Sequence, residues 1–198
     1  MTVLERTRTT WRVVDIVVAS VIAAACSVVF IAWNVAYQGP STLLNAALPG
    51  LQGLTIGPWL FAGVLAGLVV RRPGAAVYAE LVAAVIEALV GNQWGVLTLV
   101  SGLAQGLGAE LVFAVLLYRR FGPLAAFLAG AGAGVGDSIV DLLTYYPGSK
   151  PAFIVIYTLC VMLSGAVFGF LSWLLVRALA RTGALSRFAA GRDAKRVG

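Results

Sequence analysis

Residues 13–37 read VVDIVVASVIAAACSVVFIAWNVAY, and this stretch carries one charged residue, Asp15. It exceeds the roughly 20 residues that an α-helix needs to cross the hydrocarbon core of a membrane. It is also too long for the apolar region of a cleavable signal peptide, and the small residues 23–25 lie in its middle. We therefore expect this stretch to remain in the protein as the first membrane-spanning helix.

The composition of the whole chain agrees with this expectation. Of the 198 residues, 61% are hydrophobic and 11% are charged, against about 45–50% and about 25% in soluble domains. Apolar runs of spanning length recur along the chain, whereas the strands of a membrane barrel would alternate polar and apolar residues. The sequence therefore predicts an all-α integral membrane protein.

Short polar or glycine-containing segments divide the apolar sequence. We predict six transmembrane helices, over residues 13–37, 54–70, 74–90, 96–118, 123–144 and 152–179. Connections this short leave no room for a soluble domain, so residues 1–180 are expected to form a single bundle and residues 181–198 a basic cytoplasmic tail. Residues 38–53 are predicted to be a loop, in a position to serve as a lid over a binding site.

Lysine and arginine residues gather on one side of the predicted bundle. An amino terminus in the cytoplasm places thirteen of the fourteen inside and leaves only Lys150 outside. The thirteen are Arg6, Arg8, Arg12, Arg71, Arg72, Arg119, Arg120, Arg177, Arg181, Arg187, Arg192, Lys195 and Arg196. This bias predicts a multi-pass membrane protein with both termini in the cytoplasm. The basic tail then contacts lipid headgroups, or alternatively a cytoplasmic partner.

Three acidic residues fall in the outer half of the predicted bundle, where no basic residue is expected. Asp137 and Asp141 are one helical turn apart in GAGAGVGDSIVDLLTYY (130–146), and Glu87 lies near the outer end of helix 74–90. An isolated charge at the bilayer centre costs at least about 2.5–3.5 kcal/mol. These acids must therefore be protonated, solvated in a cavity, or paired with a cation that the protein does not supply. A cationic or amine-rich ligand meets the last condition.

Aromatic and amide side chains are predicted at the same level as these acids, and the turn GNQWG (91–95) follows directly after Glu87. Such a set can stack a flat ring and hydrogen-bond its edges, although an interfacial aromatic belt also explains the aromatic residues. The candidate binding residues are Trp33, Trp59, Glu87, Asn92, Gln93, Trp94, Asp137, Asp141, Tyr145 and Tyr146. A second, inner group of acids, Asp15, Glu80 and Glu110, is open to a role as hydrogen-bonded ties between helices.

The sequence argues against catalysis. It contains no His, which excludes His-based acid–base chemistry and the commonest zinc sites. Cys26 and Cys160 lie in predicted spans and are interpreted as packing residues. There is no Walker A motif, so ATP-driven work needs a partner. Residues 134–137 (GVGD) match the GxGD motif of intramembrane aspartyl proteases, but the Tyr-Asp partner motif is absent, and we expect no enzyme activity, cofactor or metal.

Several stretches together resemble a transport family. They are LPGLQGLTIGPWLFAGVLAGLVVRRPGAA (48–76), AELVAAVIEALVGNQWG (79–95), SGLAQGLGAELVF (101–113) and the small-residue motif Ala19-x-x-x-Ala23. With six short-looped helices, they resemble the substrate-binding S components of energy-coupling factor (ECF) transporters, and within these the YkoE group, which is associated with thiamine and its hydroxymethylpyrimidine precursor. The resemblance covers residues 11–180.

The resemblance implies a receptor that captures thiamine or hydroxymethylpyrimidine externally and works with a transmembrane coupling subunit and cytoplasmic ATPase subunits. It places Ala19 and Ala23 against the coupling subunit. With thiamine as ligand, Glu87 would accept a hydrogen bond from the exocyclic amine, and Trp59 or Trp94 would stack on a ring. Asp137 and Asp141 would set a negative potential, and Asn92, Gln93 and Tyr145 would supply directional hydrogen bonds. The alternatives are an S component for another small vitamin and a stand-alone, proton-coupled carrier of small organic cations.

Overall fold

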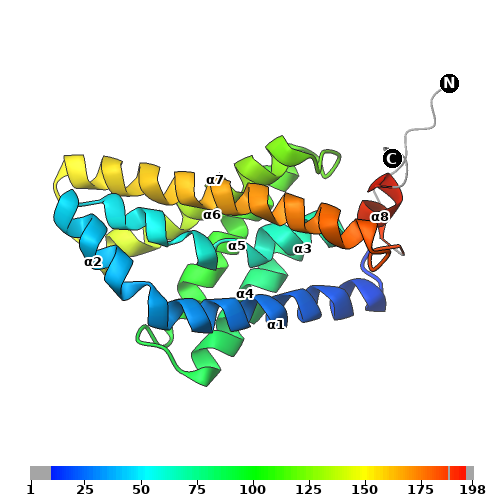
Figure 1. The fold of residues 1–198 in the computed structure, drawn as a ribbon, viewed down its shortest axis with the longest axis horizontal. Coiled ribbons are helices and arrows are strands. Elements are labelled where there is room, and N and C mark those ends of the chain that lie inside the picture. The colour runs from blue at the N-terminus through cyan, green and yellow to red at the C-terminus, as the bar shows by residue number, and fades with distance from the viewer. Residues whose placement is uncertain (1–9, 187, 195–198) are drawn as a thin grey trace.

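The structure, a computed structural model, describes residues 10–186 and 188–194, and every regular element in these ranges is helical (Figure 1). The elements are α1 (Val13–Ala36), α2 (Gln38–Ala47), the 3₁₀ helices η1 (Leu51–Thr55) and η2 (Gly57–Trp59), α3 (Ala62–Val70), α4 (Ala75–Val90), α5 (Leu97–Val115), α6 (Pro123–Thr144), α7 (Pro151–Arg181) and α8 (Ala189–Ala194). Within the described residues four helices, α1, α5, α6 and α7, are long and apolar enough to cross a membrane. The prediction of an all-α membrane protein is confirmed.

The helix predicted over residues 54–70 is wrong in its first half. That part of the chain forms η1 and η2, and α3 begins only at Ala62. Pro58 has no backbone N–H with which to continue an α-helix. Gly57 lies so close to α7 that an added side chain would collide with Ser164 and Phe168. The irregular segment therefore follows the surface of α7 instead of crossing the bundle as one straight helix.

The prediction of a loop over residues 38–53 is also wrong, because most of this segment is α2 and η1. α2 begins directly after α1, and its Pro40 lies in the first turn, where the missing N–H has no helical partner to lose. No residue of α2 is buried. The segment turns at Gly50, whose φ of +108° favours glycine and where an added Cβ would collide with Ile156 and crowd Tyr157 of α7.

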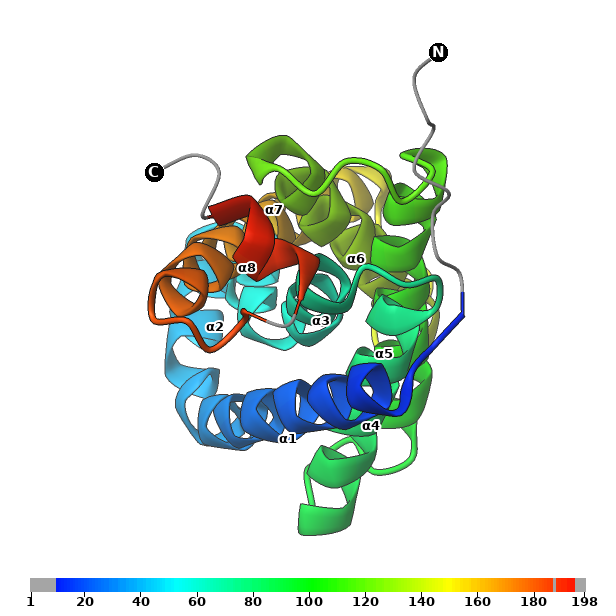
Figure 2. The same ribbon diagram turned by 90° about the vertical axis from the view of Figure 1, so that its right-hand side faces the viewer.

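α3 lies in the middle of the other helices (Figure 2), and all nine of its residues are buried. α6 packs against α5 on one side and α7 on the other. Gly132 faces Gly108 of α5, and Gly130 faces Gly165 of α7, so that a Cβ at any of these positions would overlap the backbone of the neighbouring helix. The predicted small-residue faces therefore set the spacing of helices inside this chain.

The small-residue motif of α1 also packs internally. Ala19 and Ala23 have no exposed surface, and Ala19 packs with Val70 and Ala75. Their small side chains let α1 approach α3 and α4 closely. The exposed residues of α1 include Val17 and Val21 instead. The structure places both residues in an internal helix contact. Their contact with a coupling subunit stays a prediction.

The inner acids tie the helix ends together. Asp15 pairs with Arg12 (Nη2–Oδ1 2.7 Å) and with Arg72 (Nε–Oδ2 3.3 Å). Glu110 accepts backbone N–H groups of Gly74 at 2.7 Å and of residue 76 at 2.9 Å, and the hydroxyl of Tyr118 donates to it at 2.6 Å. The pKa of Tyr118 is raised, mainly by burial and further by the nearby Glu110. Its hydroxyl therefore stays protonated and able to donate. These contacts give Asp15 and Glu110 a structural role. Glu80 accepts the backbone N–H of Gly63 at 2.5 Å, and its Oε1 is buried without a hydrogen-bond partner among the described residues.

Arginine residues mark the end of the bundle at which α1 begins and α7 ends (Figure 1). Arg12 directly precedes α1, Arg71 follows α3, Arg119 lies just after α5, and Arg177 lies near the end of α7. The first part of the basic tail packs on the bundle, because Phe188 is buried and α8 contacts α7 and α3. Arg6, Arg8, Arg187, Lys195 and Arg196 lie outside the described residues, as does the side chain of Arg192.

Candidate functional site

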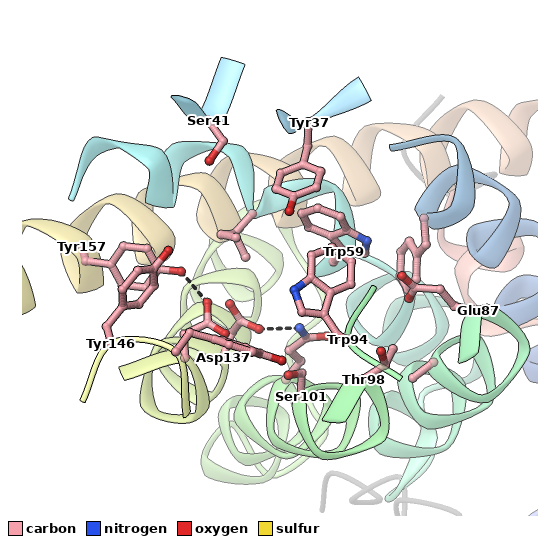
Figure 3. A pocket seen from close by; sticks show the side chains of 16 residues that line it. Tyr37, Ser41, Trp59, Glu87, Trp94, Thr98, Ser101, Asp137, Tyr146 and Tyr157 are labelled. Atoms are coloured by element: carbon pink, nitrogen blue, oxygen red, sulfur yellow. Dashed lines mark hydrogen bonds between the residues drawn. The ribbon is translucent and has the colours of Figure 1, made fainter. Parts of the chain in front are cut away.

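A cavity of about 260 Å³ lies at the end of the bundle opposite to these arginines (Figure 3). The last turns of α1, α4 and α6 meet the first turns of α5 and α7 around it. Its lining residues are Phe30, Tyr37, Ser41, Ile56, Trp59, Ala84, Glu87, Trp94, Thr98, Ser101, Gln105, Asp137, Asp141, Tyr145, Tyr146 and Tyr157. The volume is near the lower end of the roughly 300–1,000 Å³ typical of small-molecule pockets, so the cavity suits a small ligand.

Seven of the ten candidate binding residues line this cavity. They are Trp59, Glu87, Trp94, Asp137, Asp141, Tyr145 and Tyr146. The fold thus brings together acids and aromatic residues that lie up to 87 positions apart in the sequence, from Trp59 to Tyr146. Their role in binding stays a prediction.

The other three candidate residues support the cavity wall instead of lining it. Trp33 donates its indole N–H to the carbonyl of Thr55 at 2.8 Å and packs edge to face on Trp59. The Asn92 Oδ1 accepts the backbone N–H groups of residues 94 and 95 at 2.9 and 2.8 Å, which shapes the turn that carries Trp94. Gln93 bonds to Tyr37 at 2.6 Å, and Gln38 donates to Gln93 at 3.0 Å. These bonds join the turn to α1 and α2.

One end of the cavity holds Glu87, which is 2% exposed. The Asn34 Nδ2 donates to the Glu87 Oε1 at 2.8 Å, and the Trp59 indole N–H donates to the Asn34 Oδ1 at 3.0 Å. This chain of two hydrogen bonds orients both the amide and the carboxyl group. Because Glu87 lines the cavity, its carboxyl group is placed to accept a hydrogen bond from a ligand there.

The other end holds Asp137 and Asp141, on neighbouring turns of α6. The Gln105 Nε2 donates to the Asp137 Oδ1 at 2.5 Å, and the Tyr157 hydroxyl donates to the Asp141 Oδ2. The Asp137 Oδ2 is buried and has no hydrogen-bond partner among the described residues. Just beyond the end of α6, burial and the nearby Asp141 and Asp137 raise the pKa of Tyr145. Its hydroxyl therefore stays protonated and able to donate.

Three aromatic rings stand between these two acidic ends. In the view of Figure 3, Trp59 and Trp94 separate Glu87 from Asp137. The ring centroids of Trp59 and Trp94 are 5.5 Å apart at nearly a right angle, and Tyr37 lies 5.1 Å from Trp59 and 5.6 Å from Trp94. Faces of electron-rich rings attract flat and cationic groups. From one end of the cavity to the other, a ligand thus meets Glu87, an aromatic wall and then the two aspartates.

The lining contains three carboxyl groups and no Lys or Arg side chain among the described residues. The protein therefore provides no cation of its own to this cavity in the part of the chain that the structure covers. The described residues also include no group of three or more Cys, Asp or Glu side chains placed to hold a metal ion. The chemistry of the lining suits an organic ligand with amine or cationic groups.

Sequence reasoning missed six polar lining residues, Tyr37, Ser41, Thr98, Ser101, Gln105 and Tyr157. Gln105 and Tyr157 are the two that bond to the aspartates. Both lie inside long apolar helices, α5 and α7. The sequence did contain a signal for both residues, namely a polar side chain within a predicted membrane span. Hydropathy does not tell which way a helix is rotated about its axis, so the signal alone did not direct either side chain toward Asp137 or Asp141.

The structure is a bundle of apolar helices with a ligand-sized cavity near one end. This is the architecture of a membrane-embedded binding subunit. Comparison with known proteins agrees. Residues 14–136 match the family described as the permease component of an ABC-type cobalt transport system. The chain is 33% identical, over 193 residues, to a Bacillus subtilis (strain 168) protein named as a candidate HMP/thiamine permease, YkoE, with 94% of this chain and 93% of that protein covered.

A solved structure described as an S component of an ECF transporter is also similar, with a TM-score of 0.85, 32% identity and 94% of each chain covered. The chain therefore belongs to this family of transport permease components and is an S component of the ECF type. These relatives are transport components and not enzymes, which confirms the prediction that the chain is not an enzyme and removes the protease hypothesis.

Proposed function

We propose that this S component captures thiamine or its hydroxymethylpyrimidine precursor for import. The observation that carries the proposal is the order of groups in the cavity, with Glu87 at one end, Trp59 and Trp94 in the middle, and the aspartate pair at the other end. The printed name of the Bacillus subtilis relative supports the same ligands.

Thiamine has two flat rings, one carrying an exocyclic amine and one carrying a permanent positive charge. Glu87 is placed to accept from the amine in a charge-assisted hydrogen bond. Trp59 or Trp94 stacks on a ring, with a cation–π attraction of about 0.5–2 kcal/mol. Asp137 and Asp141 face the thiazolium. Hydroxymethylpyrimidine has only the amine-bearing ring, so it uses the Glu87 end and leaves the aspartate pair without a cation.

The proposed orientation follows from the two ends of the bundle. The arginines lie at one end and the cavity at the other. Since basic residues favour the cytoplasmic side, the cavity faces the outside of a bacterial plasma membrane, both termini lie inside, and α3 and α4 complete a six-span bundle with the four long helices. Import then requires a transmembrane coupling subunit and cytoplasmic ATPase subunits, because this chain has no Walker A motif.

A growth experiment tests this function. A bacterial strain that neither makes nor imports thiamine is given the chain alone, or the chain together with ECF coupling and ATPase subunits. We expect growth on limiting thiamine only with the full set. Growth with the chain alone would instead indicate the stand-alone carrier. No growth on thiamine or hydroxymethylpyrimidine, with all subunits present in the membrane, would reject these vitamins and favour another ligand.

A further inference from the structure

Asp137 and Asp141 form a pair of buried carboxyl groups on one face of α6 that are 3% and 8% exposed. Each has one oxygen occupied by a neutral donor, from Gln105 or Tyr157. The second oxygen of Asp137 is buried without a partner in the described ranges. A buried polar atom without a partner is costly, so this oxygen points to a missing proton or ligand.

The side chains around the pair are either acidic or uncharged. Those with an electrostatic or hydrogen-bond interaction with the pair are Tyr157 from α7, Glu80 from α4, Gln105 from α5, Tyr145 and Tyr146 from the segment after α6, and Tyr37 at the end of α1. Glu87 lines the same cavity. None of these groups carries a positive charge.

Two buried carboxyl groups one helical turn apart do not both ionise readily, because each charge disfavours the other. A proton on the free oxygen of Asp137 removes one of the two like charges. The pair then carries a single negative charge. If a ligand with one fixed positive charge enters and this proton leaves, two carboxylates face one cation, and the total charge of the site is again minus one.

We propose that the Asp137–Asp141 pair is a proton–cation exchange site. In the empty protein the two carboxyl groups hold one proton, and the cationic part of the ligand displaces it to solvent. This inference rests on the proposed function and makes it more specific, because a fixed cation such as the thiazolium of thiamine is the ligand chemistry that completes the exchange. The neutral hydroxymethylpyrimidine does not displace the proton.

The shared proton is tested first without ligand, by infrared spectroscopy of the purified full-length protein. The carbonyl stretch of a protonated carboxylic acid is expected in the wild type and is expected to weaken in both Asp137→Asn and Asp141→Asn. Glu110→Gln is the matched control, since Glu110 lies at the other end of α5 and is expected to leave this signal unchanged. A signal that both aspartate variants retain at full strength would overturn the proposal.

The exchange itself is measured by calorimetric titration of the same protein in buffers with different ionisation enthalpies. We expect about one proton released per thiamine and none per hydroxymethylpyrimidine. By linkage, the Kd for thiamine then falls about tenfold for each pH unit of increase over the range in which the pair is protonated. Asp137→Asn should bind thiamine more weakly and release no proton.

The possible failures are distinguishable. Thiamine binding without proton release, or with equal release for hydroxymethylpyrimidine, would overturn the exchange and leave the proposed function standing. Failure of the folded protein to bind either compound would overturn both the proposed function and the exchange, even if the infrared signal shows a shared proton.

Discussion

The hydroxyl group of Tyr157 on α7 donates a hydrogen bond to Asp141 on α6, which joins two long helices at the wall of the cavity. Tyr157 is 1% exposed, so water does not readily replace it as a donor. Hydrogen bonds to charged groups contribute about 1.5–3 kcal/mol. The contact therefore supports the charged form of Asp141 that a cationic ligand requires.

Replacing Tyr157 by Phe should weaken thiamine binding by about tenfold or more, since Asp141 loses its donor and the energy at stake is about 1.5–3 kcal/mol. Hydroxymethylpyrimidine binding should change much less. The measurement is a calorimetric titration with both compounds. Tyr118→Phe, which removes a hydroxyl at the arginine end, is the control. Equal loss for both ligands would mean that Tyr157 holds the overall shape of the cavity instead.

Trp94→Ala should weaken the binding of both thiamine and hydroxymethylpyrimidine strongly, because it removes a ring from the aromatic wall between the two acidic ends. Trp173→Ala is a suitable control, since Trp173 lies on α7 and contacts Arg177 at the other end of the bundle. Binding affinities for the two variants settle the comparison. Unchanged affinity in Trp94→Ala would show that the aromatic wall does not contribute to ligand binding.

Gly130→Ala should destabilise the protein, since its new Cβ would overlap the backbone of Gly165 where α6 meets α7. Overpacking of this kind typically costs about 1–3 kcal/mol. Gly39→Ala is the matched control, because a Cβ there meets no atom within 4 Å. Thermal unfolding in detergent provides the readout. Equal unfolding temperatures for the two variants would show that α6 and α7 are not packed as closely as described.

Ala19→Leu and Ala23→Leu should lower the unfolding temperature and weaken ligand binding, because both side chains are fully buried between α1 and its neighbours. Val17→Leu, on the exposed side of α1, should have little effect. Thermal unfolding and calorimetry on the three variants make the test. Normal stability and binding together with impaired transport would instead indicate that these alanines contact a coupling subunit.

Some of the site was predictable from sequence because depth in a membrane follows from hydropathy and charge. The levels assigned to Glu87, Asp137 and Asp141 placed all three acids at one end of the bundle, and they line one cavity. The rotation of each helix was not predictable. The burial of Ala19 and Ala23 inside the bundle, for example, did not follow from hydropathy.

Local backbone geometry explains the remaining differences. Residues 54–61 are apolar enough for a span, but Pro58 and the close approach of Gly57 to α7 favour 3₁₀ turns. α5 ends three residues before its predicted limit, because Leu117 and Tyr118 adopt positive φ angles. Hydropathy is insensitive to both effects.

The most direct test of the central claim is a calorimetric titration of the purified chain with thiamine, carried out side by side for the wild type and Glu87→Gln. The account predicts one thiamine bound per chain by the wild type and a much weaker affinity in the variant, since Glu87 is the acid placed to accept from the exocyclic amine. Equal affinity in the two proteins, or no binding by well-folded wild type, would contradict the assignment of this cavity to thiamine.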